Sequence, residues 1–112
     1  AELEKHIRDY FVYKVGKRVL GCCGLRVWDK KSAEIYGLAV DPKLMGKGIG
    51  SKLVRKCVTD AKNLKVPFVF TLTFRPNLFL RCGFKKIKMI QLPKVIFSEK
   101  TVDSDKAYGR RI

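Results

Sequence analysis

The sequence AEIYGLAVDPKLMGKGIGS, residues 33–51, joins a strand pattern to a glycine-rich loop and the start of a helix. Residues 33–40 predict a strand that Asp41-Pro42 ends. From Ile49 to Leu64, apolar residues recur at intervals of three and four with basic residues on the opposite face, which predicts an amphipathic helix. Pro67 ends this segment, and residues 68–73 predict a buried strand. The whole is therefore a right-handed strand–helix–strand unit.

Two more strands are expected before this unit, at residues 11–15 and 19–28, with a tight turn at Gly16-Lys17 between them. Together with residues 33–40 they make an antiparallel meander. Residues 2–9 are expected to be the end of a short helix.

After the unit, Pro76 is expected to lie in the first turn of a second short helix, which Gly83 ends. Residues 84–92 predict a strand, 93–105 a polar connection, and 106–112 a closing strand. The expected class is α+β, a mixed and mostly antiparallel sheet with few helices.

Length and composition limit the classes of protein that the chain can belong to. Its 112 residues fit one domain, expected over 1–112, and the apolar share of 46% argues against global disorder. No apolar run approaches the ~20 residues of a membrane span, and the charged start AELEKHIRDY is no signal peptide. We therefore expect a cytoplasmic protein with no membrane partner. The chain begins with Ala rather than Met, so we expect a processed protein or part of a longer one.

The four cysteines do not form a disulfide framework, and a zinc site is not expected, because the chain has no CxxC pair and a single distant histidine. The net charge of +15 favours polyanionic ligands: nucleic acid, a membrane surface or a phosphorylated cofactor.

Alternate glycines at 46, 48 and 50 lie at the start of the predicted helix. Such a loop turns tightly, and it brings backbone N–H groups and the positive end of the helix dipole close to an anion. It matches neither a Walker loop nor the dinucleotide fingerprint. The loop alone is equally compatible with a plain flexible turn.

The residues AEIYGLAVDP, LMGKGIGSKLV and FLRCGF together resemble the GNAT family of acetyl-CoA-dependent N-acetyltransferases. The resemblance covers residues 11–92, with 106–112 as a further matching strand. Met45 stands where the family expects Arg or Gln, and the family's first strand and most of its first helical region would precede Ala1. Within the family, AEIYGLAVDP, TLTFRPNLFLRCGF and Leu92-Pro93 look most like the N-acetylglutamate synthase branch of arginine biosynthesis. That branch has phenylalanine at the position of Phe79, where other members carry a tyrosine.

The resemblance implies acetyl-CoA as co-substrate. The pyrophosphate would lie on the backbone N–H groups of the glycine loop, aided by Lys43, Lys47 and Lys52, and the pantetheine would pair with a strand end that splays at a bulge. Transfer would be direct, without an acyl-enzyme, to a small-molecule amine such as glutamate. The cofactor-binding residues implied are Leu38, Ala39, Val40, Met45, Gly46, Lys47, Gly48, Ile49, Gly50, Ser51 and Phe79.

For the acceptor, strand alternation predicts one face that carries Glu34, Tyr36, Leu38 and Val40. Glu34 is the candidate general base and Tyr36 a candidate acid or substrate contact, while Thr73 is a candidate donor near the thiolate. Arg26 and Arg75 are candidates for binding an acceptor carboxylate. Each of these residues has a purely structural alternative, as a solvated charge or a packed side chain.

Three other functions stay open from sequence: an N-acetyltransferase for protein N-termini, lysines or polyamines; a nucleic-acid-binding domain, disfavoured because the basic residues are dispersed; and a non-catalytic acetyl-CoA-binding domain. A sheet without its first strand would have an exposed edge, so a homodimer is also expected as an alternative to a monomer.

Overall fold

The computed structural model describes residues 2–6, 10–100 and 102–112. Within them a seven-stranded sheet has the order β1-β2-β3-β4-β5-β7-β6. β4 and β5 are parallel and the other neighbours are antiparallel. The strands are β1 (Glu2–His6), β2 (Tyr10–Val15), β3 (Arg18–Val27), β4 (Ser32–Val40), β5 (Phe68–Leu72), β6 (Lys85–Lys86) and β7 (Ala107–Arg111). The expected α+β class is confirmed.

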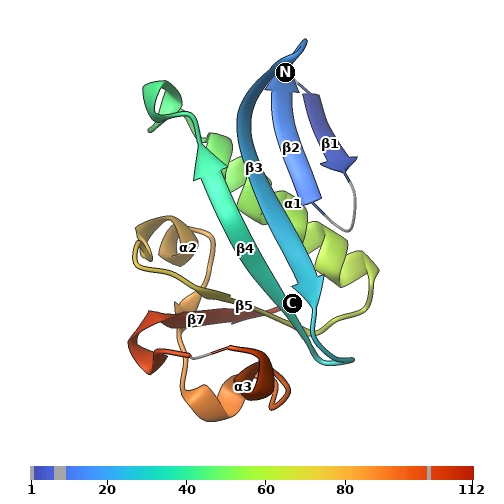
Figure 1. Cartoon of the computed structure of the whole chain (residues 1–112), viewed down its shortest axis with the longest axis vertical. Coiled ribbons are helices and arrows are strands. Elements are labelled where there is room, and N and C mark those ends of the chain that lie inside the picture. Colours follow the sequence, from blue (N-terminus) through green and yellow to red (C-terminus); the bar gives the residue numbers. More distant parts are fainter. Residues whose placement is uncertain (1, 7–9, 101) are drawn as a thin grey trace.

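The predicted strand–helix–strand unit is confirmed. Helix α1 (Ile49–Asn63) connects β4 to β5 and lies behind the strands of the sheet in Figure 1. It buries one apolar stripe against β2, β3 and β4. The buried residues of the stripe are Ile49, Leu53, Val54, Cys57, Val58 and Ala61.

The expectation of a helix end at residues 2–9 is wrong for the described part. Glu2–His6 forms β1, an edge strand in antiparallel register with β2 from Glu2↔Lys14 to His6↔Tyr10. A pairing partner decides strand formation more strongly than local composition, and that partner lies outside the segment. Residues 7–9 lie outside the described residues.

The expected strand over 84–92 is also wrong for most of its length. Only Lys85–Lys86 forms β6, and Met89–Gln91 forms a short 3-10 helix. The buried residues of this segment are Phe84, Ile87 and Leu92. Their spacing does not alternate as in a strand, and the chain leaves the sheet at Ile87.

Two further helices complete the fold. α2 (Asn77–Arg81) follows β5, as the Pro76 and Gly83 signals predict. The expected connection at 93–105 contains α3 (Ile96–Glu99), which the fully buried Ile96 anchors. In the described residues, no helix has both the length and the apolar character that crossing a membrane requires.

Each face of the sheet carries its own core. α1 and α2 cover one face, with Phe11, Leu25 and Ile35 in that core. On the other face Phe70 and Ala107 pack with Ile87, Leu92 and Ile96 beneath the segment that contains α3. The C-terminal segment is therefore an integral layer of the fold.

All four cysteines are free thiols. Cys23 and Cys57 are buried between the sheet and α1, with 3.6 Å between their sulfur atoms. The hydrogen bond from Cys57 and burial raise the pKa of the Cys23 thiol far above its ordinary value. Cys23 is therefore an inert core residue.

Strand β4 contains a bulge that the alternation argument did not foresee. Cys22 pairs with Ala39 and Gly24 with Tyr36, so Gly37 and Leu38 together face a single residue, Cys23. Gly37 has φ +62°, a left-handed conformation that suits glycine. The extra residue reverses the alternation, and the prediction that Glu34, Tyr36, Leu38 and Val40 share one face is wrong.

The two halves of β4 consequently face different layers. Leu38 and Val40 pack toward the core beneath α1. Tyr36 instead lies on the opposite face, where its ring packs edge to face with Tyr10 at 5.9 Å between centroids. Glu34, two residues before Tyr36, shares that opposite face.

Candidate functional site

The parallel pair β4 and β5 separates partway along its length. Pairing runs from Ser32↔Phe68 to Ile35↔Thr71 and stops there. Figure 1 shows the two strands diverging beyond this point, so within the described residues the end of β4 has no strand partner on its β5 side. A cleft of about 1320 Å³ opens between the strand ends, and the loop before α1 and helix α2 also line it.

The glycine loop forms one wall of this cleft. Gly46 and Gly48 both have φ +82°, and Gly48 is the N-cap of α1. No side chain of the described residues caps the helix, so the N–H groups of its first turn remain available to a ligand. No acidic residue lies in that turn. The positive end of the α1 dipole and the free N–H groups of its first turn both favour binding of an anion.

The structure gathers most of the predicted site residues around the cleft. The implied cofactor residues that line it are Leu38, Ala39, Val40, Met45, Gly46, Gly48, Ile49, Gly50, Ser51 and Phe79. Lys47 is exposed and does not line it. Tyr36, Thr73 and Arg75 also line the cleft.

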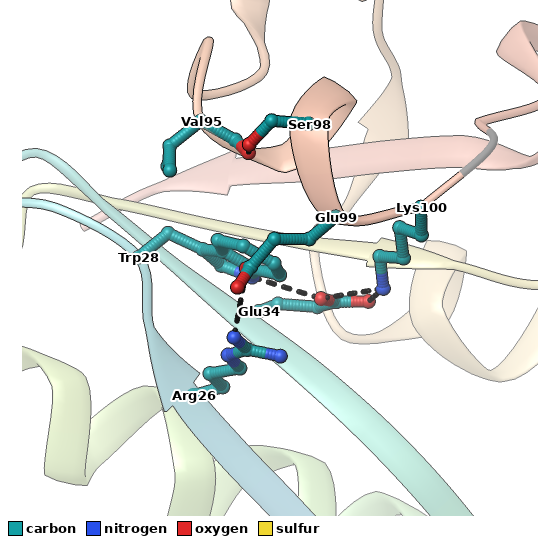
Figure 2. A network of polar contacts seen from close by, with 7 residues as sticks. All are labelled: Arg26, Trp28, Glu34, Val95, Ser98, Glu99 and Lys100. Carbon is teal, nitrogen blue, oxygen red and sulfur yellow. Dashed lines mark hydrogen bonds and ion pairs between the residues drawn. The ribbon is translucent and has the colours of Figure 1, made fainter.

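Glu34 and Arg26 are the two acceptor-side candidates that do not line the cleft. The Glu34 side chain is almost fully buried, and its carboxylate accepts from Trp28 Nε1 at 2.9 Å and pairs with Lys100 Nζ at 2.8 Å. Arg26 pairs with Glu99 at 2.9 Å. Figure 2 shows these residues as one polar cluster beside α3.

A strand that splays at a bulge beside an uncapped, glycine-led helix is the arrangement expected from the resemblance. A family model described as "Acetyltransferase (GNAT) family" matches residues 1–84. The chain belongs to the GNAT family. This membership rests on the sequence match, and the cleft supplies the matching geometry.

Relatives of this GNAT chain agree with the assignment. An uncharacterized N-acetyltransferase, CT2212, of Chlorobaculum tepidum is 38% identical over 97 residues, 87% of this chain and 63% of the relative. An amino-acid acetyltransferase of Mycobacterium tuberculosis is 37% identical over 82 residues, 73% of this chain and 47% of the relative. The chain thus spans about half to two thirds of the length of these proteins.

A solved structure gives the same result in three dimensions. Rv2747 of Mycobacterium tuberculosis, in complex with CoA and NLQ, superposes with a TM-score of 0.72 at 33% identity. The match covers 81% of this chain and 57% of that one.

Some residues of the GNAT cleft were missed from sequence. Gly37 shapes the cleft through the bulge, and a glycine inside a strand pattern is a signal for such a bulge. Phe74, Asn77 and Arg81 also line the cleft. They lie in the segment that follows β5, and the divergence of β5 from β4 turns this segment toward the cleft.

Tyr10 stabilises the bulge from the neighbouring strand. Its hydroxyl donates to the carbonyl of Gly37 at 3.2 Å and lies 3.6 Å from Cys22 Sγ. The hydrogen bond with Cys22 and partial burial raise the pKa of Tyr10 to about 12, so the hydroxyl stays protonated at neutral pH. Tyr10 thus remains a donor to Gly37.

Asp41 supports the loop between β4 and α1. Its carboxylate accepts from the backbone N–H of Lys43 at 3.0 Å and pairs with Arg18 at 3.2 Å. The Lys43 hydrogen bond and the Arg18 contact lower the pKa of Asp41 below its usual 3.8. The folded state therefore holds this proton less tightly than the unfolded state.

We expect Asp41→Asn to be less stable than the wild type at neutral pH, with the difference narrowing as pH falls below about 3.8. The stabilisation is complete above the ordinary aspartate pKa and is lost as pH drops through the lower folded value. Urea unfolding of the wild type and the variant, from neutral pH to well below the usual aspartate pKa, measures the difference in their free energies of unfolding. A stability difference that stays constant down to the lowest pH would contradict the assignment.

Proposed function

We propose that this GNAT domain, residues 1–112, binds acetyl-CoA in the cleft and transfers its acetyl group directly to the amine of an amino acid. The observation that carries the proposal is the conjunction of two features. The β4 end is unpaired toward β5, and the N-terminus of α1 is uncapped at the same cleft. These are the two elements that an extended ligand with a diphosphate group requires.

The residues present fit acetyl-CoA. The backbone N–H groups of residues 48–51 lie at the start of α1, where no side chain of the described residues caps the helix and no acidic residue lies in the first turn. This arrangement suits a pyrophosphate. The unpaired side of β4 from Leu38 to Val40 offers strand-type hydrogen bonds to the pantetheine amides. When bound, acetyl-CoA supplies an acetyl thioester as the electrophile.

The reaction forms an N–C bond from the acceptor amine to the acetyl carbon and breaks the C–S bond of the thioester. A backbone N–H near the bulge stabilises the developing oxyanion. The amine gives up a proton, for which Glu34, acting directly or through water, is the proposed base. The departing thiolate takes a proton, for which Tyr36 is the proposed donor. Thr73 is proposed to donate a hydrogen bond near that thiolate.

An amino acid is the proposed acceptor because two arginines line the cleft. Arg75 and Arg81 both line the cleft and suit a carboxylate, while a cationic polyamine would be repelled. Two findings on similar Mycobacterium tuberculosis chains support this choice. One chain is named an amino-acid acetyltransferase, and the Rv2747 structure holds CoA and NLQ. Glutamate is the first acceptor to test, as for the N-acetylglutamate synthase branch.

The test supplies acetyl-CoA with glutamate, other amino acids, lysine peptides and a polyamine in turn, and measures the release of free thiol. The proposal predicts turnover with one or more amino acids and Arg75→Met raising the KM of that acceptor about tenfold, equivalent to about 1.4 kcal/mol for a charged hydrogen bond. Turnover confined to peptides or polyamines would contradict the acceptor class. Acetyl-CoA binding with no turnover would leave a non-catalytic binding domain.

Direct transfer also predicts that no thiol carries the acetyl group. Cys22 is the half-buried cysteine next to the bulge, and Cys23, Cys57 and Cys82 are buried. We expect Cys22→Ser to keep kcat within about twofold, since no covalent intermediate depends on the sulfur. Rapid acid quench during turnover, followed by mass spectrometry, should find no acetyl-cysteine. Loss of kcat together with a trapped acetyl-cysteine would overturn direct transfer.

A further inference from the structure

A polar cluster that does not line the cleft lies on the sheet face opposite α1 and α2, around Arg26, Trp28 and Glu34 (Figure 2). Arg26 and Glu34 are direct cross-strand partners on β3 and β4. Directly opposed residues have Cβ atoms about 5 Å apart. The pair therefore presents one cation and one anion at a fixed, short separation.

Trp28 holds both groups in place. Its indole N–H donates to Glu34 at 2.9 Å, and the Arg26 guanidinium stacks on its ring at 3.9 Å from the centroid. The Glu34 side chain is 4% exposed, while that of Arg26 is 51% exposed. The Trp28 ring thus contacts both groups: the buried carboxylate of Glu34 and the exposed guanidinium of Arg26.

Arg26 and Glu34 each form an ion pair with one of two consecutive residues, Glu99 and Lys100. The Glu99 carboxylate lies 2.9 Å from Arg26, and the Lys100 ammonium lies 2.8 and 2.9 Å from the two oxygens of Glu34. One segment therefore supplies a carboxylate to the cation and an ammonium to the anion. A free amino acid carries the same two groups on a single carbon.

This cluster is close to the proposed chemistry. Glu34 lies two residues from Tyr36 on the same face of β4, which is roughly 7 Å along the strand. Tyr36 lines the cleft. An amine held at Glu34 would be near the point where β4 and β5 separate.

We propose that Arg26, Trp28 and Glu34 form a binding site for a zwitterionic amino acid, and that Glu99 and Lys100 occupy it until the amino acid displaces them. The proposal rests on the proposed amino-acid acceptor and adds its site and its self-inhibition. The incoming amine replaces Lys100 at Glu34, and the incoming carboxylate replaces Glu99 at Arg26.

Displacement requires only that two side chains swing away. The Glu99 and Lys100 side chains are 48% and 37% exposed, so both can return to water. The exposed Arg26–Glu99 pair contributes only about 0–1 kcal/mol. The Glu34 carboxylate is buried and needs a cation beside it, which the ammonium of the incoming amino acid supplies when Lys100 leaves. α3 itself stays in place, because the fully buried Ile96 anchors it in the second core.

The experiment is calorimetric titration of the whole chain with L-glutamate, L-glutamine and glycine, and with glutarate and butylamine as probes that carry only one of the two charges. The double variant Glu99→Gln/Lys100→Met removes the internal competitor. If the occupied form makes up about nine tenths of the wild type, the variant binds amino acids about tenfold more tightly. Adding Arg26→Met to the double variant should abolish the gain.

Two controls separate displacement from a change in the fold. Lys94→Met removes an exposed lysine of the same segment that lies outside the cluster, and it should bind as the wild type does. Lys100→Arg keeps a cation against Glu34 and should also retain wild-type affinity. Urea unfolding of each variant checks that all are folded.

Equal affinity of the wild type and the double variant, or no binding of any of the three amino acids to either, would overturn the inference and make the cluster purely structural. Tighter binding of glutarate or butylamine alone would also overturn it. Titration with acetyl-CoA is run on the same samples. Tighter amino-acid binding with no acetyl-CoA binding would contradict the proposed function and leave the amino-acid site intact.

Discussion

Gly48→Val is expected to raise the dissociation constant for acetyl-CoA by about 100-fold, which corresponds to about 2.7 kcal/mol. Gly48 has φ +82° and is the N-cap of α1 at the cleft. A β-branched residue in this conformation is strained by about 1–3 kcal/mol, and the loop relieves the strain by turning its N–H groups away from the ligand. Calorimetric titration with acetyl-CoA measures the change.

Gly16→Val is the matched control. Gly16 also has a positive φ, +56°, and an added Cβ there meets nothing within 4 Å, as at Gly48. It lies in the β2–β3 turn and does not line the cleft. We expect a comparable loss of stability with unchanged acetyl-CoA affinity. If folded Gly48→Val protein binds acetyl-CoA as tightly as the wild type, the glycine loop before α1 does not contribute to acetyl-CoA binding.

Phe70→Ala is expected to lower the free energy of unfolding by about 4 kcal/mol, the usual effect of emptying a phenylalanine site in a core. Phe70 is fully buried in β5, where it contacts the core beneath α3. The lost side chain leaves a cavity between the sheet and the C-terminal segment. Urea denaturation of the wild type and the variant measures the difference.

Phe74→Ala provides the comparison, since the same substitution four residues later removes a ring that is 82% exposed. This ring contacts Lys106, whose ammonium lies 3.6 Å from its centroid. We expect a loss of no more than about 1 kcal/mol, the range of an exposed cation–π contact. Similar losses for both variants would contradict the assignment of a second core under α3.

The segments with local signals were predictable from sequence. The helix was expected from Ile49 to Leu64 and runs from Ile49 to Asn63, because its apolar period and the glycines before it are local features. Ten of the eleven implied cofactor residues line the cleft for the same reason, since all except Phe79 belong to one continuous strand–loop–helix segment.

The features that depend on distant partners were not predictable. β1 forms because β2 pairs with it, and the position of the expected bulge, at Gly37, depends on the register of β4 with β3. Glu34 and Arg26 were expected to face the acceptor. Their partners Lys100 and Glu99 lie 66 and 73 residues away in the chain. No local sequence pattern encodes such contacts, so the surroundings of Arg26 and Glu34 could be described only from the structure.

The most direct test of acetyl-CoA binding in the cleft is a nuclear magnetic resonance titration of the whole chain, following backbone amide shifts as acetyl-CoA is added. The largest shifts are expected at residues 38–40 and 46–51, with saturation at one equivalent. Residues around Lys31 and Lys94, which line a separate basic pocket, should remain unchanged. No saturable shift in the cleft, or shifts centred on that basic pocket, would contradict the account.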